Sequence, residues 1–244
     1  MLRYQESLSG VSVISMRLTP IASVTTLLVT ALLAACTAPD PDTAGSTPVE
    51  TRQVLLDNEF VEVFTLTVNP GSSLPPHIGQ ARVVYSLGDY RVRYTEGGQS
   101  READWMSGDV HAHGAGDHGL DNVGTAPARL LIVARKDRAL TPTDTPRPDP
   151  AGASTPHTHL VLDDARFLVT EVRLPAGAAL PAHQGLDRVV FALSDYTLRY
   201  EADGAPARET THTSGEAHWH AADRHAVTNV GETEARYLLV QLRR

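Results

Sequence analysis

Histidine is the residue type in this sequence best placed to do chemistry, and it recurs in two matching sets. The chain has 11 histidines among 244 residues. A neutral imidazole can bind a divalent transition metal, or it can donate and accept hydrogen bonds. The histidines therefore predict either a metal site or a polar binding pocket in each half of the chain. The first set is His77, His111, His113 and His118, and the second is His183, His218, His220 and His225.

An arginine accompanies each set. Arg82 and Arg188 each begin a short apolar run at the same place in their half. An inward guanidinium beside neutral imidazoles would form a donor-rich pocket for a small anion such as a carboxylate. The same charge would repel a divalent cation at short range. The alternative is that both arginines lie on an outer face and take no part in binding.

The two halves of the chain are copies of each other. An offset of 106 residues aligns Arg82–Tyr85 with Arg188–Phe191, and after one inserted residue an offset of 107 aligns His118–Gly124 with His225–Gly231. Agreement over many positions indicates a duplicated domain. The period is too long for a solenoid, so we expect two separate domains.

The elements that must position these side chains are strands. Residues 60–68 alternate apolar with polar, Asn69-Pro70-Gly71 reads as a turn, and residues 82–94 form two short apolar runs broken at Gly88-Asp89. Residues 130–133 form a continuous apolar run that is typical of a buried strand. Neither half has convincing helical periodicity. Each half is therefore predicted to be an all-β barrel or sandwich.

Two motifs in each half resemble those of the cupin superfamily of small double-stranded β-helix barrels. The first cupin motif opens with Gly, five residues and His, as in Gly71-(x5)-His77 and Gly177-(x5)-His183. The second opens with Gly-Asp and ends with His, three residues and Asn. Its matches are Gly108-Asp109 with His118-(x3)-Asn122, and Gly215-Glu216 with His225-(x3)-Asn229.

The resemblance implies an all-β chain of two tandem jelly-roll-like barrels, a bicupin. We expect cupin domain 1 at residues 51–137 and cupin domain 2 at 157–244. A proline-rich linker at 138–156 joins them, because proline at this density excludes a helix or a central strand.

Metal-binding cupins use both histidines of the first motif, its glutamate and the histidine of the second motif. Here the second histidine is replaced by Gly79 and Gly185, and the glutamate by Arg82 and Arg188. A divalent transition metal would need a substitute ligand. His113 and His220 could supply one if their strands face the barrel interior, and Asp187 could add a carboxylate. The metal-ligand candidates are therefore His77, His113 and His118 in the first barrel, and His183, His220 and His225 in the second. If those strands face outward, these are surface histidines and Trp219 points inward instead.

The N-terminal region has the pattern of an export signal. Residues 1–35 contain a basic flank and an apolar run that is short for a membrane span. Leu33-Ala34-Ala35-Cys36 resembles a bacterial lipobox, which implies lipidation of Cys36 and a flexible tether at 36–50. A plain secretory signal or an N-terminal anchor helix is the alternative, and Met16 is an alternative start. The expected location is the bacterial cell envelope, on the periplasmic or extracytoplasmic side, with the membrane as partner through Cys36.

Composition excludes several classes of function. The formal net charge is -8 and no basic stripe is present, so we expect no nucleic-acid partner. There is no phosphate-binding glycine loop, no nucleophile elbow and no catalytic cysteine. The sequence therefore favours an envelope lipoprotein that binds a small molecule through Arg82, Arg188, His77 and His183. A metal-dependent dioxygenase or isomerase and a purely structural envelope protein are the alternatives.

Overall fold

The computed structural model of the chain describes residues 50–140 and 155–243, and these residues form 18 β-strands. Over this described part there is no helix, and so none long and apolar enough to cross a membrane. The predicted signal peptide at 1–35, Cys36 and nearly all of the predicted tether lie outside the described residues. So does most of the predicted linker.

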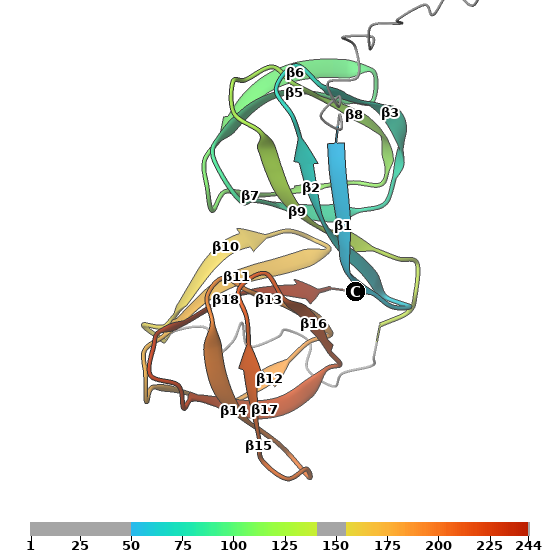
Figure 1. Cartoon of the computed structure of the whole chain (residues 1–244). Helices are drawn as coiled ribbons and strands as arrows, with labels where there is room; N and C mark the ends of the chain where they lie inside the picture. The colour runs from blue at the N-terminus through green and yellow to red at the C-terminus, as the bar shows by residue number, and fades with distance from the viewer. Residues whose placement is uncertain (1–49, 141–154, 244) are drawn as a thin grey trace, which may run out of the picture. The chain divides into compact units, whose positions relative to one another are not determined.

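Nine strands form the first half and nine form the second (Figure 1). The first nine are β1 (Glu50–Asp57), β2 (Val61–Val68), β3 (Ser73–Gly79), β4 (Arg82–Ser86), β5 (Tyr90–Glu96), β6 (Gln99–Trp105), β7 (Val110–His113), β8 (Gly116–Asn122) and β9 (Ala128–Arg135). The second nine are β10 (Thr158–Asp163), β11 (Phe167–Leu174), β12 (Ala179–Gly185), β13 (Arg188–Ala192), β14 (Tyr196–Ala202), β15 (Arg208–His212), β16 (Ala217–His220), β17 (Asp223–Asn229) and β18 (Ala235–Leu242).

The strands pair into two antiparallel sheets in each half. In the first half the orders are β1-β2-β9-β4-β7 and β3-β8-β5-β6. The second half repeats them as β10-β11-β18-β13-β16 and β12-β17-β14-β15. The same order in both halves confirms the prediction of an all-β fold with two tandem barrels. We refer to the two halves as barrel 1 and barrel 2.

Proline is tolerated within the strand that carries the first-motif histidine because that strand lies at a sheet edge. β3 pairs only with β8, and its register shifts between Leu74 and His77, where Pro75 and Pro76 lie. An edge strand with a bulge is where a strand can lose amide donors at small cost. β12 has the same shift, between Leu180 and His183.

Both faces of β4 are buried, which explains its continuous apolar run. Val84 packs in the interior of barrel 1, whereas Val83 and Tyr85 on the opposite face belong to a second apolar cluster. Side chains alternate between the two faces of a strand. Arg82 therefore shares the inner face with Val84, and its guanidinium enters the barrel.

That second cluster contains equivalent residues from both barrels. It joins the outer faces of the two five-stranded sheets into one apolar core. From barrel 1 it includes Val61, Val63, Val83, Tyr85, Leu131 and Val133, and from barrel 2 Phe167, Val169, Val189, Phe191, Leu238 and Val240.

Trp219 faces the shared core, where its ring stacks on that of Phe60 at a centroid distance of 5.0 Å. By strand alternation its neighbours His218 and His220 lie on the opposite, inner face of β16. The idea that Trp219 points into the barrel interior is therefore wrong. In barrel 1, His111 pairs with Val84 and His113 with Arg82 in the β4–β7 register, so both also face inward.

Candidate ligand-binding site

Barrel 1 encloses a cavity of about 60 Å³. Its polar lining includes six side chains from β4, β5, β7 and β8: Arg82, Tyr94, Glu96, His111, His113 and His118. An outer groove of about 580 Å³ shares Arg82 and His118 with this cavity and adds His77. The predicted residues of the first half therefore come together around these two adjoining spaces.

Arg82 is the only arginine in that cavity lining, and it is 8% exposed. Its Nη1 donates to the carbonyl of Gln80 at 3.2 Å. Within the described residues this is its one hydrogen bond, and it has no ion pair there. Burial lowers the pKa of the guanidinium and the charge of Glu96 opposes that change, but an arginine side chain stays charged in proteins.

His77 and His118 face each other across the β3–β8 pair, with ring centroids 4.2 Å apart. Nδ1 of His77 lies 2.9 Å from the carbonyl of Pro75, so that nitrogen carries the proton and Nε2 is free to accept. Burial and the charge of Arg82 lower the pKa of His118 to about 4. Its ring is therefore neutral near neutral pH.

His111 and His113 complete the inner face. Burial, with His113 and Arg82 as smaller causes, lowers the pKa of His111 to about 3, and its ring stacks on Trp105 at 3.9 Å. Burial also lowers the pKa of His113, whose Nδ1 lies 3.5 Å from Oε2 of Glu96. The cavity therefore holds neutral imidazoles around one permanent positive charge.

Barrel 2 contains the equivalent arginine, but there both Nη atoms are hydrogen-bonded. Arg188 is 3% exposed, and its Nη1 donates to the carbonyls of Leu186 at 3.0 Å and Ala221 at 3.3 Å. Its Nη2 donates to Tyr200 Oη at 2.9 Å and to Asp223 Oδ1 at 3.1 Å.

Asp223 accepts three hydrogen bonds from side chains. Its partners are Arg188, the Tyr200 hydroxyl and Nδ1 of His225, which lies 3.0 Å from Oδ1. Burial alone would raise the pKa of Asp223, but the bonds from His225 and Tyr200 and the charge of Arg188 hold it well below its usual range. Burial raises the pKa of Tyr200. This is a closed, charge-balanced network.

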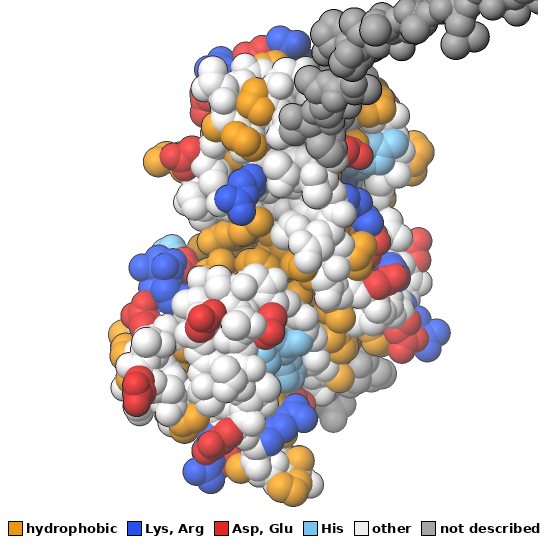
Figure 2. Space-filling model, viewed as in Figure 1, with side chains coloured by type: hydrophobic (Ala, Val, Ile, Leu, Met, Phe, Trp, Pro, Cys, Tyr) orange, Lys and Arg blue, Asp and Glu red, His pale blue; other side chains and the backbone are white. Residues whose placement is uncertain are grey.

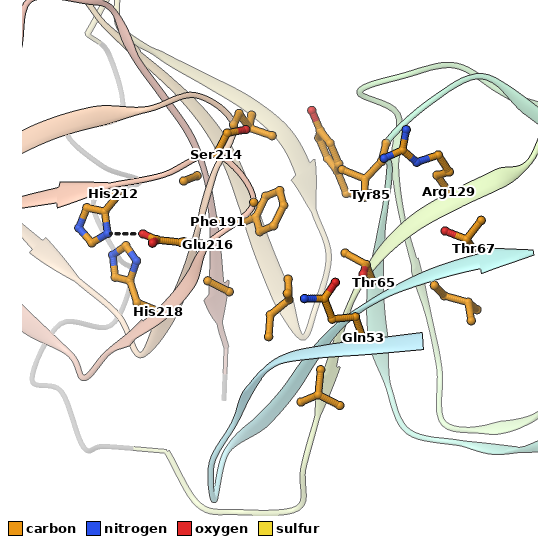
Figure 3. A pocket seen from close by; sticks show the side chains of 18 of the residues that line it. Gln53, Thr65, Thr67, Tyr85, Arg129, Phe191, His212, Ser214, Glu216 and His218 are labelled. Carbon is orange, nitrogen blue, oxygen red and sulfur yellow. Dashed lines mark ion pairs between the residues drawn. The ribbon is translucent and has the colours of Figure 1, made fainter. Parts of the chain in front are cut away.

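Two further inward histidines of barrel 2 are neutral. Burial lowers the pKa of His218 to about 4 and that of His220 to about 3. The ring of His218 stacks on His212 at 4.2 Å, and Nδ1 of His212 lies 3.5 Å from Glu216 (Figure 3). His212, Glu216 and His218 line a wide groove of about 1040 Å³, whose lining from barrel 1 includes Gln53 and Thr65. In this groove the carboxylate of Glu216 is already paired with His212.

The residues do not fit a cupin metal. A Cβ placed on Gly185 would lie 2.5 Å from Nη1 of Arg188 and 2.9 Å from Cε1 of His225. A Cβ on Gly79 would lie 2.1 Å from Cε1 of His118. The space of the absent second histidine is therefore filled by guanidinium and imidazole. Among residues 50–140 and 155–243, no three His, Cys, Asp or Glu side chains are grouped to hold a metal ion.

The second-motif asparagines bind backbone. Asn229 is 0% exposed; its Nδ2 donates to the carbonyls of Leu174 at 2.8 Å and Thr233 at 2.7 Å, and its Oδ1 accepts from Gly231. Asn122 makes the equivalent bonds in barrel 1. Asp187 is buried, and its carboxylate accepts from the amide of Ala222 at 2.9 Å.

Sequence reasoning did not place Glu96, Asp223, Tyr94 or Tyr200 in the site. The signal lay in positions where the two copies differ. Gly116 stands at the place of Asp223, and Ala202 at the place of Glu96. Each barrel therefore takes its carboxylate from a different strand.

On the face shown in Figure 2, acidic and basic side chains are intermixed over both barrels. No large patch of one sign is seen there among the described residues. The expectation that nucleic acid is not a partner stays a prediction.

Solved structures with a similar fold include bicupins. The chain aligns with AerE from Microcystis aeruginosa at 15% identity, with a TM-score of 0.59, over 81% of this chain and 94% of that one. It aligns with a single-substitution variant of the B. subtilis oxalate decarboxylase at 13% identity and a TM-score of 0.58, over 84% and 80% of the two chains. A third match is the formate complex of the Lactobacillus farciminis oxalate decarboxylase, at 12% identity and a TM-score of 0.54, over 80% and 86%.

At these identities the similarity shows the fold alone, and it confirms the predicted tandem cupin architecture. No protein-family model matches the chain, and no curated protein matches it either.

Proposed function

We propose that this tandem cupin-fold chain is an envelope-anchored lipoprotein whose barrel 1 binds a small anionic molecule. The observation that carries the proposal is the Arg82 guanidinium, which is buried against a cavity without a carboxylate partner among the described residues. Buried charges in proteins are normally paired, because removing an ion from water costs several kcal/mol. An anion that enters the cavity would supply the missing partner.

The lining suits recognition better than metal chemistry. His113 and His118 are held neutral beside Arg82, so they can orient a ligand by hydrogen bonds without adding charge. The poor fit of both barrels to a metal argues against the dioxygenase or isomerase alternative. Polar side chains inside the cavity argue against a purely structural protein.

The test is anion binding by the full-length protein, titrated by calorimetry or by NMR in a buffer free of carboxylates. We expect saturable binding to the wild-type protein that Arg82→Ala weakens roughly 10- to 100-fold and that Arg82→Lys weakens less. Arg91→Ala is the matched control, because its exposed guanidinium pairs with Glu102 and Asp104 and is absent from the cavity lining. Binding that is unchanged in Arg82→Ala would refute the proposal.

A further inference from the structure

The two barrels hold the same side chains around their arginines, but only barrel 2 supplies a hydrogen-bonded carboxylate to its arginine. The matched pairs are Arg82 and Arg188, Tyr94 and Tyr200, His77 and His183, and His118 and His225. The two barrels of this duplicated chain can therefore be compared position by position. The carboxylate beside Arg188 in barrel 2 indicates the chemical group that Arg82 could bind in barrel 1.

The arginines enter the two barrels in the same way. Each Nη1 donates to the carbonyl two residues earlier, from Arg82 to Gln80 at 3.2 Å and from Arg188 to Leu186 at 3.0 Å. Each guanidinium also packs against a glycine that leaves it room. The remaining donors of Arg82 are therefore presented to the cavity as those of Arg188 are presented to Asp223.

The histidine pairs also match. Ring centroids are 4.2 Å apart for His77 and His118 and 4.4 Å apart for His183 and His225. Nδ1 of His183 lies 2.8 Å from the carbonyl of Pro181, which repeats the contact of His77. In each pair the tautomer of one ring, that of His77 or His183, is fixed by a backbone carbonyl. That ring faces the histidine that lies beside the arginine, His118 or His225.

The difference lies at a single position of the second-motif strand. Asp223 in β17 corresponds to Gly116 in β8, which has no side chain. In barrel 1 the ring of His118 turns to the carbonyl of Gly116, at 3.3 Å from Nδ1. Within the described residues, neither Nη2 of Arg82 nor the hydroxyl of Tyr94 has a hydrogen-bond partner.

We propose that Asp223 is a built-in occupant of barrel 2, and that the carboxylate of a small external ligand takes the equivalent place in barrel 1. In barrel 1, Arg82 and Tyr94 would donate to the ligand carboxylate as Arg188 and Tyr200 donate to Asp223. The inference rests on the proposed function and adds the chemical class of the ligand.

The size of the cavity agrees with this class. A cavity needs roughly 10–15 Å³ to hold one water molecule, so about 60 Å³ accommodates a group the size of ~4 waters. A carboxylate with a small substituent has that size. A longer tail would extend into the outer groove, which shares Arg82 and His118 with the cavity.

Glu96 is the one carboxylate in the lining of the barrel 1 cavity, and it does not replace Asp223. Its Oε2 lies 3.5 Å from His113, and it makes no hydrogen bond to Arg82. Its charge acts on Arg82 only over a longer range. Glu96→Gln therefore removes a negative charge beside the proposed carboxylate position of barrel 1, but it does not create that position, because Glu96 does not fill it.

The decisive experiment is a gain of binding in barrel 2. Calorimetric titration with acetate should give one site on the full-length wild-type chain and two on Asp223→Ala. Asp223→Asn should keep one site, because an amide of the same shape fills the space. The double variant Asp223→Ala, Arg188→Ala should return to one. A single site on folded Asp223→Ala would overturn the inference.

Removing Asp223 leaves Arg188 without its buried partner, so the variant could fail to fold. In that case it is refolded in acetate and in chloride at equal ionic strength. Recovery in acetate alone supports the built-in occupant, and equal recovery in both salts contradicts it.

Other outcomes separate this inference from the proposed function. Sulfate or phosphate binding that depends on Arg82, without acetate binding, would overturn the carboxylate class and leave anion binding intact. No anion binding to wild-type protein would refute the proposed function. Acetate binding that appears only in Glu96→Gln would show that Glu96 occupies barrel 1, and this would also overturn the inference.

We expect Glu96→Gln instead to bind acetate at least as tightly as wild type, and Arg82→Ala to bind it roughly 10- to 100-fold more weakly.

Discussion

Acidification should destabilise this protein well above the pH at which its carboxylates become protonated. His111, His218 and His220 are buried on inner faces and have pKa values of about 3, about 4 and about 3. An unfolded histidine has a pKa near 6.5. Because the folded pKa is depressed, the folded state stays neutral while the unfolded state takes up protons. Stability is therefore complete above about pH 6.5 and is lost progressively as the pH falls toward 4.

The magnitude follows from the proton balance. At about pH 5 an unfolded histidine is almost fully protonated, which favours unfolding by about 2 kcal/mol per buried neutral histidine. Three such residues give about 6 kcal/mol, a large part of the 5–15 kcal/mol typical of a folded protein. The result depends little on the folded pKa values, provided that they lie at about 4 or below.

Urea unfolding at about pH 8, 6 and 5, in buffers free of carboxylates, measures this change. His218→Gln should reduce the loss of unfolding free energy between pH 8 and 5 by about 2 kcal/mol. The measurement at pH 8 serves as the control, because there the variant reports only its packing cost. An unfolding free energy that is flat from pH 8 to 5, or a His218→Gln variant with the wild-type slope, would refute the reasoning.

Three further predictions concern other parts of the chain. Asn229→Ala should destabilise barrel 2 by about 2–4 kcal/mol in urea unfolding, because it removes the hydrogen-bond partner of the buried Leu174 carbonyl, the part-buried Thr233 carbonyl and the Gly231 amide; a cost below about 1 kcal/mol would contradict this. Gly185→Ala should lower the free energy of unfolding by about 1–3 kcal/mol, because its methyl group would meet Arg188. Gly88→Ala is the control, because a Cβ there has no atom within 4 Å, and it should change the urea midpoint little. Equal effects of the two substitutions would show that the close packing is unimportant. Cys36→Ala should abolish lipid labelling and partition into detergent, and unchanged partition would exclude the lipid anchor.

The fold was predictable because two copies of one pattern give two independent observations of every motif. The spacing from Gly71 to His77 and from His118 to Asn122 recurs in the second half, and the sheet orders recur with it. A one-residue change of offset between the motifs did not obscure this agreement. Local periodicity then located strands such as β2 and β4.

The orientation of Arg82 was not predictable from its own strand. Val83 and Val84 are both apolar, because one faces the shared core and the other faces the barrel interior. Alternation assigns residues to two faces, but it cannot say which face is the interior when both are buried. The outer environment of β4 is set by the other half of the chain.

The carboxylate of barrel 2 escaped notice for a different reason. Repeats are usually read for agreement, and Asp223 is a position of disagreement with Gly116. Its importance appears only when three donors are seen to converge on it: Arg188, Tyr200 and His225.

The shared core has a consequence for how the two pockets can change. Equivalent residues of both barrels belong to this core, such as Val63 and Val169, and the strand contacts are reciprocal: β1 contacts β16, and its counterpart β10 contacts β7. This is the arrangement of an isologous dimer interface. In a dimer of identical subunits, every substitution appears in both binding sites at once. A single chain that carries both copies is free of that constraint, so one pocket can acquire a permanent internal occupant while its twin stays open.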